Sequence, residues 1–240
     1  MRACQHPDLV KELVHIEERQ IVRSHKIGVI HLFSDQTTEQ QALANETVSP
    51  AFSEFLHWLG DPVRLQGWQG YRGGLDVKGD TTGKESFVAS WRSNQIMFHC
   101  ASLIPFNPRD RQQIERRRFI GNDIVVIVFQ EGDGEVDLST IRSKQTHIVC
   151  IVRPQPEHTA YRIAIAAKEG ISNFAPFDFP SLFERTRESR DLLLWKLING
   201  ERAAYRAEAF ANQILRTREA LLQEVIERCG GYSELKRYNA

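Results

Sequence analysis

Residues 116–129 read RRRFIGNDIVVIVF, and the part from Ile124 to Phe129 decides the fold class. It is an unbroken run of β-branched and aromatic apolar residues, without the polar alternation of a half-exposed strand. Such runs are typical of strands that are covered on both faces, as in sheets with flanking helices. The stretch therefore predicts a buried central strand in an α/β domain.

The residues before this strand predict a helix with a basic end. Asn107 is a suitable N-cap, Pro108 suits the first turn, and the helix is expected to run to about residue 118. Arg116, Arg117 and Arg118 would lie near its C-terminus, where cations interact favourably with the helix dipole. Gly121 is predicted to stop the helix, which places Asn122 at the mouth of the buried strand.

Helical and strand patterns alternate over the rest of the chain. We predict a single domain over residues 1–240, with its core over about 6–228, in which helices flank a central mixed β-sheet. Helices are expected at 7–20, at 49–60 with Ser49 as cap, and as one long C-terminal helix from Asp191 to Arg228. Strands are expected at 26–32, 86–91, 95–101, 146–153 and 160–167, the second and third forming a hairpin.

Composition restricts the classes of function. Lys and Arg number 31, as do Asp and Glu, so no global field would draw the chain onto nucleic acid. No stretch reaches the roughly 18 uncharged apolar residues of a membrane span, and we expect a cytoplasmic protein without direct membrane insertion. The four cysteines lie far apart, with no CxxC, which favours free thiols and no metal site.

Asn122 has a chemistry of its own at this junction. A carboxamide offers one acceptor and one donor group, so a fixed Asn can hold a water on one side and an oxygen on the other, although it is no strong base. A structural explanation stays open: Gly and Asn both tolerate left-handed backbone, and an arginine run is usually a solvated face.

The polar junction lies in a series of blocks that resembles the Rap GTPase-activating proteins. RQQIERRRFIGNDIVVIVFQE is similar to the central segment of that family, which includes the spine-associated Rap-GAPs and, more distantly, tuberin. Further similar blocks follow in family order, among them NETVSPAFSEFLHWLGDPVRLQGWQGYRGGLD, DTTGKESFVASWRSNQIMFHCASLIPFNPRDRQQ, TIRSKQTHIVCIVR and KLINGERAAYRAEAFANQILRTREALL. The resemblance extends from about His6 to about Leu222.

The resemblance implies a Rap-GAP catalytic domain that activates a small GTPase in trans. Asn122 matches the family's "Asn thumb", which enters the active site of GTP-bound Rap and orients the attacking water. The chain would then hydrolyse nothing alone and need no cofactor, because GTP and magnesium belong to the partner. We expect the upstream dimerisation domain of the family to be absent, which predicts an excised fragment or a short member, and a homodimer stays open.

The resemblance also implies roles for residues around Asn122. Gly121 and Asp123 would be structural, no residue would bind a metal, and the remaining matched positions would bind the GTPase or position the helix. Those positions are Lys26, Arg116, Arg117, Arg118, Phe119 and Arg218. The family usually has His where this chain has Phe119, so hydrogen bonds and any positive charge are lost at that position.

Several alternatives accompany this interpretation. The chain would otherwise be a catalytically silent GTPase-binding module, an activator of a related GTPase such as Rheb or Ral, or a stand-alone nucleotide hydrolase or nucleic-acid binder. GDTTGKE at residues 79–85 resembles a P-loop, but its glycine spacing is one residue short and Glu85 replaces Ser or Thr. His99 is interpreted as a core histidine whose hydrogen bonds are satisfied, rather than a general base.

Overall fold

The computed structural model describes residues 7–156 and 159–229. They form two compact units: residues 23–204 make the larger one, and the segments before residue 23 and after residue 204 make the smaller one. The predicted single domain over 1–240 is not tested by this division and stays a prediction. Each unit is considered by itself below.

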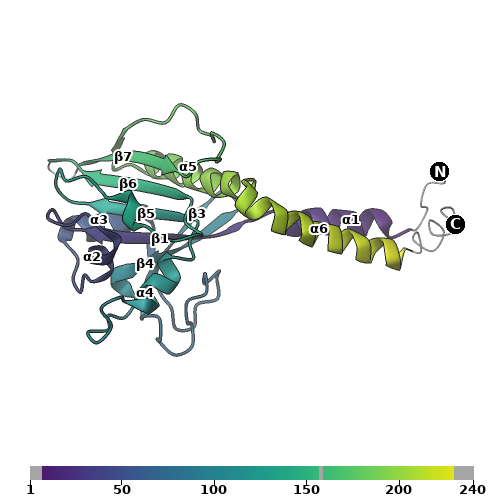
Figure 1. Cartoon of the computed structure of the whole chain (residues 1–240), viewed down its shortest axis with the longest axis horizontal. Coiled ribbons are helices and arrows are strands. Elements are labelled where there is room, and N and C mark those ends of the chain that lie inside the picture. Colours follow the sequence, from purple (N-terminus) through teal and green to yellow (C-terminus); the bar gives the residue numbers. More distant parts are fainter. Residues whose placement is uncertain (1–6, 157–158, 230–240) are drawn as a thin grey trace. The chain divides into compact units, whose positions relative to one another are not determined.

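The larger unit is built on an eight-stranded mixed sheet within the described residues (Figure 1). Its strands are β1 (Ser24–Leu32), β2 (Asp61–Arg64), β3 (Glu85–Trp91), β4 (Asn94–Cys100), β5 (Val125–Gln130), β6 (Ile148–Pro154), β7 (Ala160–Ala167) and β8 (Leu182–Glu184). Their spatial order is β2-β3-β4-β1-β5-β6-β7-β8. The pairs β4–β1, β1–β5 and β5–β6 are parallel and the others are antiparallel, which confirms the predicted mixed sheet.

β5 is the buried central strand that the sequence predicts. All six of its residues are buried, and it lies between β1 and β6, with Ile27 and Ile148 both opposite Val125. The hairpin prediction is also confirmed, since β3 and β4 pair antiparallel around Arg92 and Ser93. Hydrogen bonds to two neighbouring strands make β5 a rigid base for the residues that precede it.

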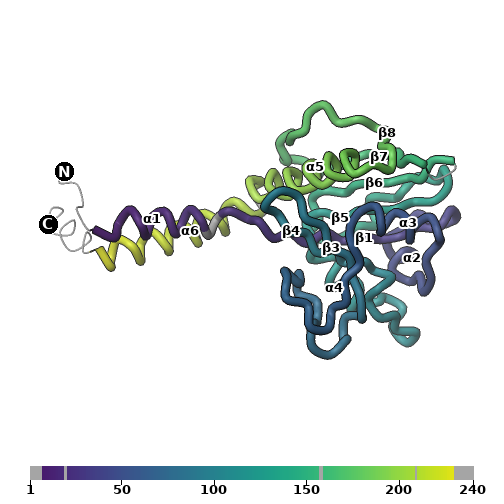
Figure 2. Tube along the Cα trace, turned by 180° about the vertical axis from the view of Figure 1, so that it is seen from behind, coloured from purple at the N-terminus to yellow at the C-terminus, as the bar shows by residue number. Residues whose placement is uncertain are grey.

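Helices pack around this sheet. The larger unit contains α2 (Glu39–Leu43), α3 (Pro50–Leu59), α4 (Ile114–Ile120), α5 (Arg187–Tyr205) and the 3-10 turns η1 (Ala101–Leu103) and η2 (Leu138–Thr140). α3 has the predicted ends: the Ser49 side chain accepts from the Phe52 N–H, and Pro50 opens the first turn. α5 runs along the sheet in Figure 2, where a Cβ at Gly200 would touch the Ile148 side chain of β6 at 3.4 Å.

α4 begins later than predicted. The sequence predicts a helix over 108–118, and this prediction is wrong at its N-terminal end because the helix begins at Ile114. Asn107 Oδ1 accepts from Arg109 N–H, and the Asp110 carboxylate accepts from Gln112 N–H and Ile114 N–H. These local side-chain bonds stabilise turns in place of the first helical turns. Gln113 has a φ of 47°, and the helix begins directly after it.

The predicted single C-terminal helix is wrong in one respect. α5 ends at Tyr205, and a second helix, α6, begins at Glu208 and ends at Arg228. Ala207 between them has an extended backbone, with φ −71° and ψ 153°. Neither Gly nor Pro marks this break, and the apolar repeat continues through it, so periodicity alone did not reveal it.

The smaller unit consists of α1 (Leu9–Gln20) and α6 among the described residues. Figures 1 and 2 both show the two helices side by side. Arg218 pairs with Glu17, and Arg228 pairs with Glu12 at 3.2 Å. Ile16 and Val225 are the buried apolar residues of this unit.

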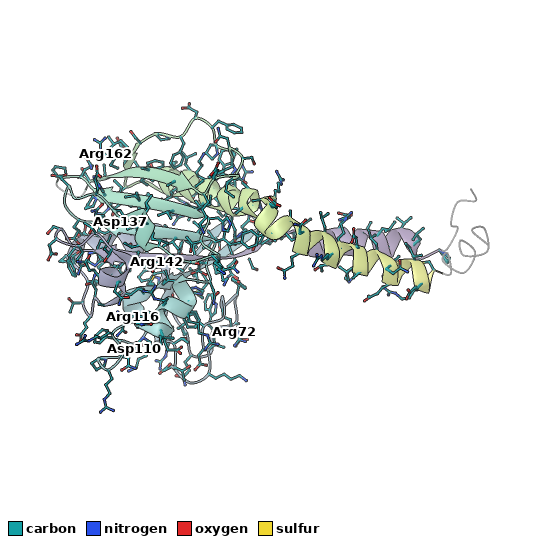
Figure 3. The ribbon with its side chains drawn as sticks, viewed as in Figure 1. Arg72, Asp110, Arg116, Asp137, Arg142 and Arg162 are labelled. Atoms are coloured by element: carbon teal, nitrogen blue, oxygen red, sulfur yellow. The ribbon has the colours of Figure 1, made fainter. Side chains whose placement is uncertain are left out.

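One arginine fixes α4 to the rest of the larger unit. Arg116, labelled in Figure 3, is 2% exposed and forms no ion pair within the described residues. Its guanidinium donates to Ile104 O at 2.9 Å, Leu43 O at 2.8 Å and Asn45 O at 2.6 Å. Burial lowers the pKa of Arg116. Three backbone carbonyls from two other segments are thereby tied to the basic helix.

We expect Arg116→Met to destabilise the protein by on the order of 3 kcal/mol, because three acceptors lose a charged donor. Arg118→Met, at an exposed position on the same helix, is the control and should change stability by less than about 0.5 kcal/mol. Urea unfolding followed by circular dichroism measures both. Equal midpoints for the two variants would contradict the anchoring role.

His31 provides a second prediction, on pH. Its ring stacks on Phe52 at 4.6 Å, and Nε2 lies 2.7 Å from Glu131 Oε1. Burial lowers the pKa of His31 from its ordinary value of 6.5, although Glu131 opposes the shift. The unfolded chain therefore binds the proton more readily than the folded one, and stability should fall as the pH drops below about 6.5.

His31→Gln should reduce this loss between pH 7 and pH 5, as measured by urea midpoints across that range. His57→Gln, at an exposed position of α3, is the matched control and should keep the wild-type slope. A His31→Gln slope equal to that of the wild type would show that another group controls the acid sensitivity.

Candidate functional site

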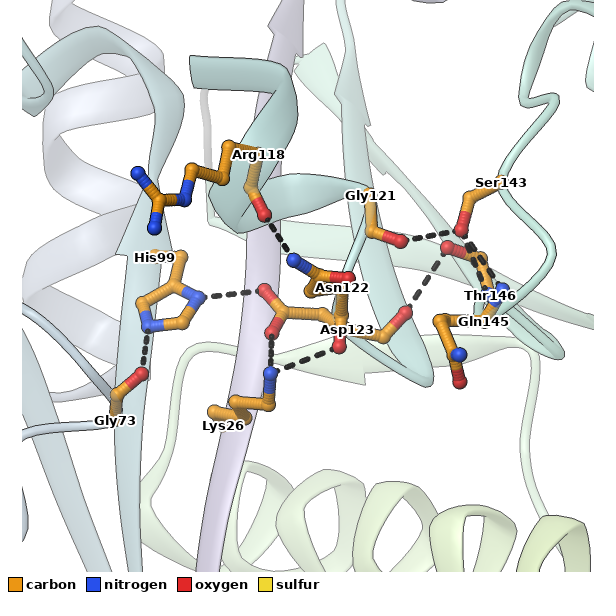
Figure 4. Close-up of polar contacts among 10 residues, drawn as sticks. All are labelled: Lys26, Gly73, His99, Arg118, Gly121, Asn122, Asp123, Ser143, Gln145 and Thr146. Atoms are coloured by element: carbon orange, nitrogen blue, oxygen red, sulfur yellow. Dashed lines mark hydrogen bonds and ion pairs between the residues drawn. The ribbon is translucent and has the colours of Figure 1, made fainter. Parts of the chain in front are cut away.

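Asn122 lies in the connection of residues 121–124 between α4 and β5, on an exposed turn (Figure 4). Its N–H donates to Phe119 O at 3.0 Å, which closes the end of the helix. Its side-chain Nδ2 donates to Arg118 O at 2.7 Å. Within the described residues Oδ1 accepts no hydrogen bond, so the carboxamide has its donor engaged and its acceptor free.

Gly121 is required by a close approach rather than by left-handed backbone. Its φ is −70°, and a Cβ there would lie 2.7 Å from Arg117 O. Neither Gly121 nor Asn122 has a positive φ, so the left-handed explanation of the pair is wrong. Ser143 Oγ donates to Gly121 O from a separate loop, which fixes this peptide from the other side.

A pocket of about 550 Å³ opens beside Asn122. Lys26 and Arg118 bring positive charge to its wall, and Asp76 and Glu115 bring negative charge. Phe119, His99 and the backbone of Gly73 and Gly74 complete much of the lining. The pocket is thus open and balanced in formal charge, and Asn122 is among the residues that line it.

The fold brings together two of the predicted site residues, Lys26 and Asn122. Lys26 Nζ donates to Asn122 O at 2.9 Å and lies 3.6 Å from Asp123 Oδ1. Asp123 is fully buried, and its Oδ2 lies 2.8 Å from His99 Nδ1. His99 Nε2 lies 3.0 Å from Gly73 O, so the interpretation of His99 as a satisfied core histidine is confirmed.

Sequence reasoning missed the contact of Asp123 with His99 and of Lys26 with the Asn122 peptide. The three side chains come from β1, β4 and the connection that leads into β5, and these strands are neighbours only in the folded sheet. Gly28 pairs with both His99 and Val126 in the two parallel ladders. No local motif signals this register, and only the strand order could have predicted it.

The three consecutive arginines have three different environments. Arg116 is the buried anchor described above. Arg117 donates to Glu39 Oε2 at 3.0 Å and Gln40 Oε1 at 2.7 Å, so it ties α4 to α2. Burial raises the pKa of Glu39, and Arg117 opposes that shift. Arg118 is exposed, lines the pocket, and has no side-chain partner within the described residues.

Phe119 and Arg218 complete the expected set. The Phe119 ring meets His99 edge-on, with 5.2 Å between ring centroids, and packs against a buried cluster that includes Leu75 and Met97. Arg218 belongs to the smaller unit, where it pairs with Glu17. Phe119 is therefore part of the pocket wall, whereas Arg218 is not among the pocket residues.

The P-loop-like segment forms a turn that is closed on itself. The Asp76 carboxylate accepts from the N–H groups of Lys78, Gly79 and Thr81, and from Thr81 Oγ1 at 2.7 Å. These hydrogen bonds lower the pKa of Asp76. A P-loop needs its N–H groups for phosphate, and here a carboxylate uses them.

The described residues contain neither a metal-binding cluster nor a membrane-spanning helix. No group of three or more His, Cys, Asp or Glu is placed to hold a metal ion there. Cys100 and Cys150 are buried free thiols, Cys229 is partly exposed, and Cys4 lies outside the described residues. No helix in the described part of the chain is long and apolar enough to cross a membrane.

Comparison with known proteins gives the family. The Rap/ran-GAP family profile matches residues 42–219. The "GTPase-activating Rap/Ran-GAP domain-like protein 3" of Gallus gallus is 41% identical over 230 residues, which cover 94% of this chain and 25% of that protein. The "Signal-induced proliferation-associated 1-like protein 3" of Mus musculus is 38% identical over 232 residues, covering 95% of this chain and 13% of that protein.

A solved structure agrees with these relatives. The GAP domain of TSC2 superposes with a TM-score of 0.66 at 27% sequence identity, covering 75% of this chain and 98% of that domain. The chain spans about a quarter or less of the curated relatives named above. The family profile covers well over half of the chain, and the α/β architecture agrees with it: the chain belongs to the Rap/ran-GAP family.

Proposed function

We propose that this chain activates a Rap-type small GTPase in its GTP-bound form by supplying Asn122 in trans. The observation that carries the proposal is the state of the Asn122 carboxamide: its donor is bound to Arg118 O, and its acceptor is free at the edge of an open pocket. A fixed acceptor suits the orientation of a water molecule. The GAP-family relatives and the TSC2 GAP domain support the same class of activity.

In this mechanism Asn122 Oδ1 accepts a hydrogen bond from the attacking water. The water oxygen bonds to the γ-phosphorus, the bond from that phosphorus to the β–γ bridging oxygen breaks, and GDP leaves while the proton passes to the phosphate. An amide is too weak a base to take the proton, so it acts by positioning. GTP and magnesium belong to the partner's site, this chain needs no cofactor, and it has no hydrolase activity alone.

Arg118 and Phe119 are the best candidates for direct contact with the GTPase. Arg118 combines exposure with a guanidinium that has no partner among the described residues, whereas Arg116 and Arg117 serve the fold. Phe119 replaces a polar contact by an apolar one and so affects affinity or preference among GTPases. We also propose that Arg218 contacts the GTPase. A homodimer and a cytoplasmic location are further parts of the proposal.

The acceleration of GTP hydrolysis that an activator must supply can be stated as a reduction of the barrier. Activation in the Ras system accelerates hydrolysis about 10⁵-fold, which corresponds to about 7 kcal/mol of barrier. A single preorganised hydrogen-bonding group contributes about 10²- to 10³-fold in enzymes. Asn122 would therefore supply part of the effect, and ordering of the partner's loops and exclusion of water would supply the rest.

Single-turnover GTP hydrolysis by a Rap-type GTPase, titrated with this protein, tests the proposal. We expect Asn122→Ala to lower the rate at saturation on the order of 100-fold or more, with little change in the half-saturating concentration. Arg118→Ala should raise the half-saturating concentration and leave the saturating rate close to that of the wild type. The thermal midpoints of both variants should stay near the wild-type value, because both side chains are exposed.

The possible results separate the alternatives. A fast Asn122→Ala variant would overturn the role of the amide, and hydrolysis of GTP by the isolated chain would overturn action in trans. Binding to the Rap-type GTPase without acceleration would indicate a silent binding module. Acceleration of a Rheb- or Ral-type GTPase alone would retain the activity and change the partner.

A further inference from the structure

The peptide that follows Asn122 is held by side chains that come from outside α4. The Lys26 ammonium, from β1, donates to the Asn122 carbonyl oxygen at 2.9 Å. The same ammonium lies 3.6 Å from Asp123 Oδ1. Figure 4 shows Lys26 bridging these two oxygens, opposite the Asn122 Nδ2 contact with Arg118 O. The carbonyl and the side chain of Asn122 are thus fixed from two directions.

Asp123 links Lys26 to the buried His99. Its side chain is fully buried, and a buried carboxylate is unfavourable unless cations or hydrogen-bond donors compensate it. His99 Nδ1 supplies one contact, at 2.8 Å from Oδ2. Oδ1 has no hydrogen bond within the described residues, and the Lys26 ammonium is the cation that faces it. Lys26 therefore compensates Asp123 while it holds the Asn122 carbonyl.

Two glycines make room for these contacts. A Cβ at Gly28 would lie 3.2 Å from Asp123 Oδ2, and a Cβ at Gly73 would lie 2.9 Å from His99 Nε2. Gly73 also has a φ of 60°, which disfavours other residues, and its carbonyl lies 3.0 Å from His99 Nε2. His99 thus links the pocket loop at Gly73 to Asp123.

We infer that Lys26, Asp123 and His99 form a positioning network that sets the orientation of the Asn122 peptide, and that Lys26 acts through this peptide rather than by contact with the GTPase. The inference rests on the proposed function of Asn122. The Lys26 side chain is 34% exposed, so its ion pair contributes modestly to stability. Its position at the peptide matters more, because small misplacements of a catalytic group reduce rates by up to about 100-fold.

The test is the same titrated single-turnover assay with Lys26→Met and Asp123→Asn. We expect each substitution to lower the saturating rate by on the order of 10- to 100-fold, with the half-saturating concentration changed less than about threefold. Lys196→Met is the matched control, because Lys196 Nζ also donates to backbone carbonyls, those of Phe174 and Pro176. We expect that variant to lose stability but to keep both kinetic values at an assay temperature where it is folded.

A second measurement reports on the peptide without a GTPase. The Asp123 N–H belongs to the peptide whose carbonyl Lys26 holds, and it donates to Ile120 O at 3.2 Å. Its hydrogen exchange, followed by NMR in the free protein, should therefore be several-fold faster in Lys26→Met. It should be unchanged in Lys196→Met. Unchanged exchange at the Asp123 N–H in Lys26→Met would overturn the positioning network whatever the kinetic result.

The two proposals fail in different ways. A normal saturating rate with a raised half-saturating concentration in Lys26→Met would mean that Lys26 contacts the GTPase, which overturns the inference and leaves Asn122 in place. If the wild-type protein accelerates no GTPase, the proposed function fails. Hydrogen exchange then decides alone whether the network orders the Asn122 peptide.

Discussion

The arrangement of the site depends on the hydrogen bonds that the buried Arg116 guanidinium donates to three backbone carbonyls. α4 has only seven residues, and a helix of that length has little stability of its own. Arg116 ties it to the ends of α2 and η1 through three carbonyls, and Arg117 adds the contact with Glu39. β5 then continues from the held helix into the sheet, so the intervening turn is fixed at both ends.

The three adjacent arginines therefore have different roles, although their side chains are chemically identical. The side chains of a short helix point in different directions at successive positions, so Arg116 enters the core, Arg117 meets α2 and Arg118 faces the pocket. A count of positive charge would treat them as one basic patch. Of these three arginines, Arg118 alone has a guanidinium without a partner among the described residues.

Local sequence signals predicted the elements whose causes are local. The apolar run of β5, the capped α3 and the β3–β4 hairpin were all readable, because burial, capping and turn residues lie within each segment. The start of α4 was missed because the Asp110 side chain competes for the N–H groups, and the break at Ala207 has no sequence marker. The role proposed for Asn122 rests on resemblance and stays a prediction, whereas the contacts of Lys26, Asp123 and His99 depend on strand order.

The contact between Asn122 Nδ2 and Arg118 O has a thermodynamic consequence. The last carbonyls of a helix lack intrahelical partners, and here one of them selects a rotamer and an orientation of the neighbouring amide. Side-chain ordering on association commonly costs about 0.5 to 1.5 kcal/mol per mobile group. Because this carboxamide is already restrained in the free chain, part of that entropy loss would precede formation of the proposed complex.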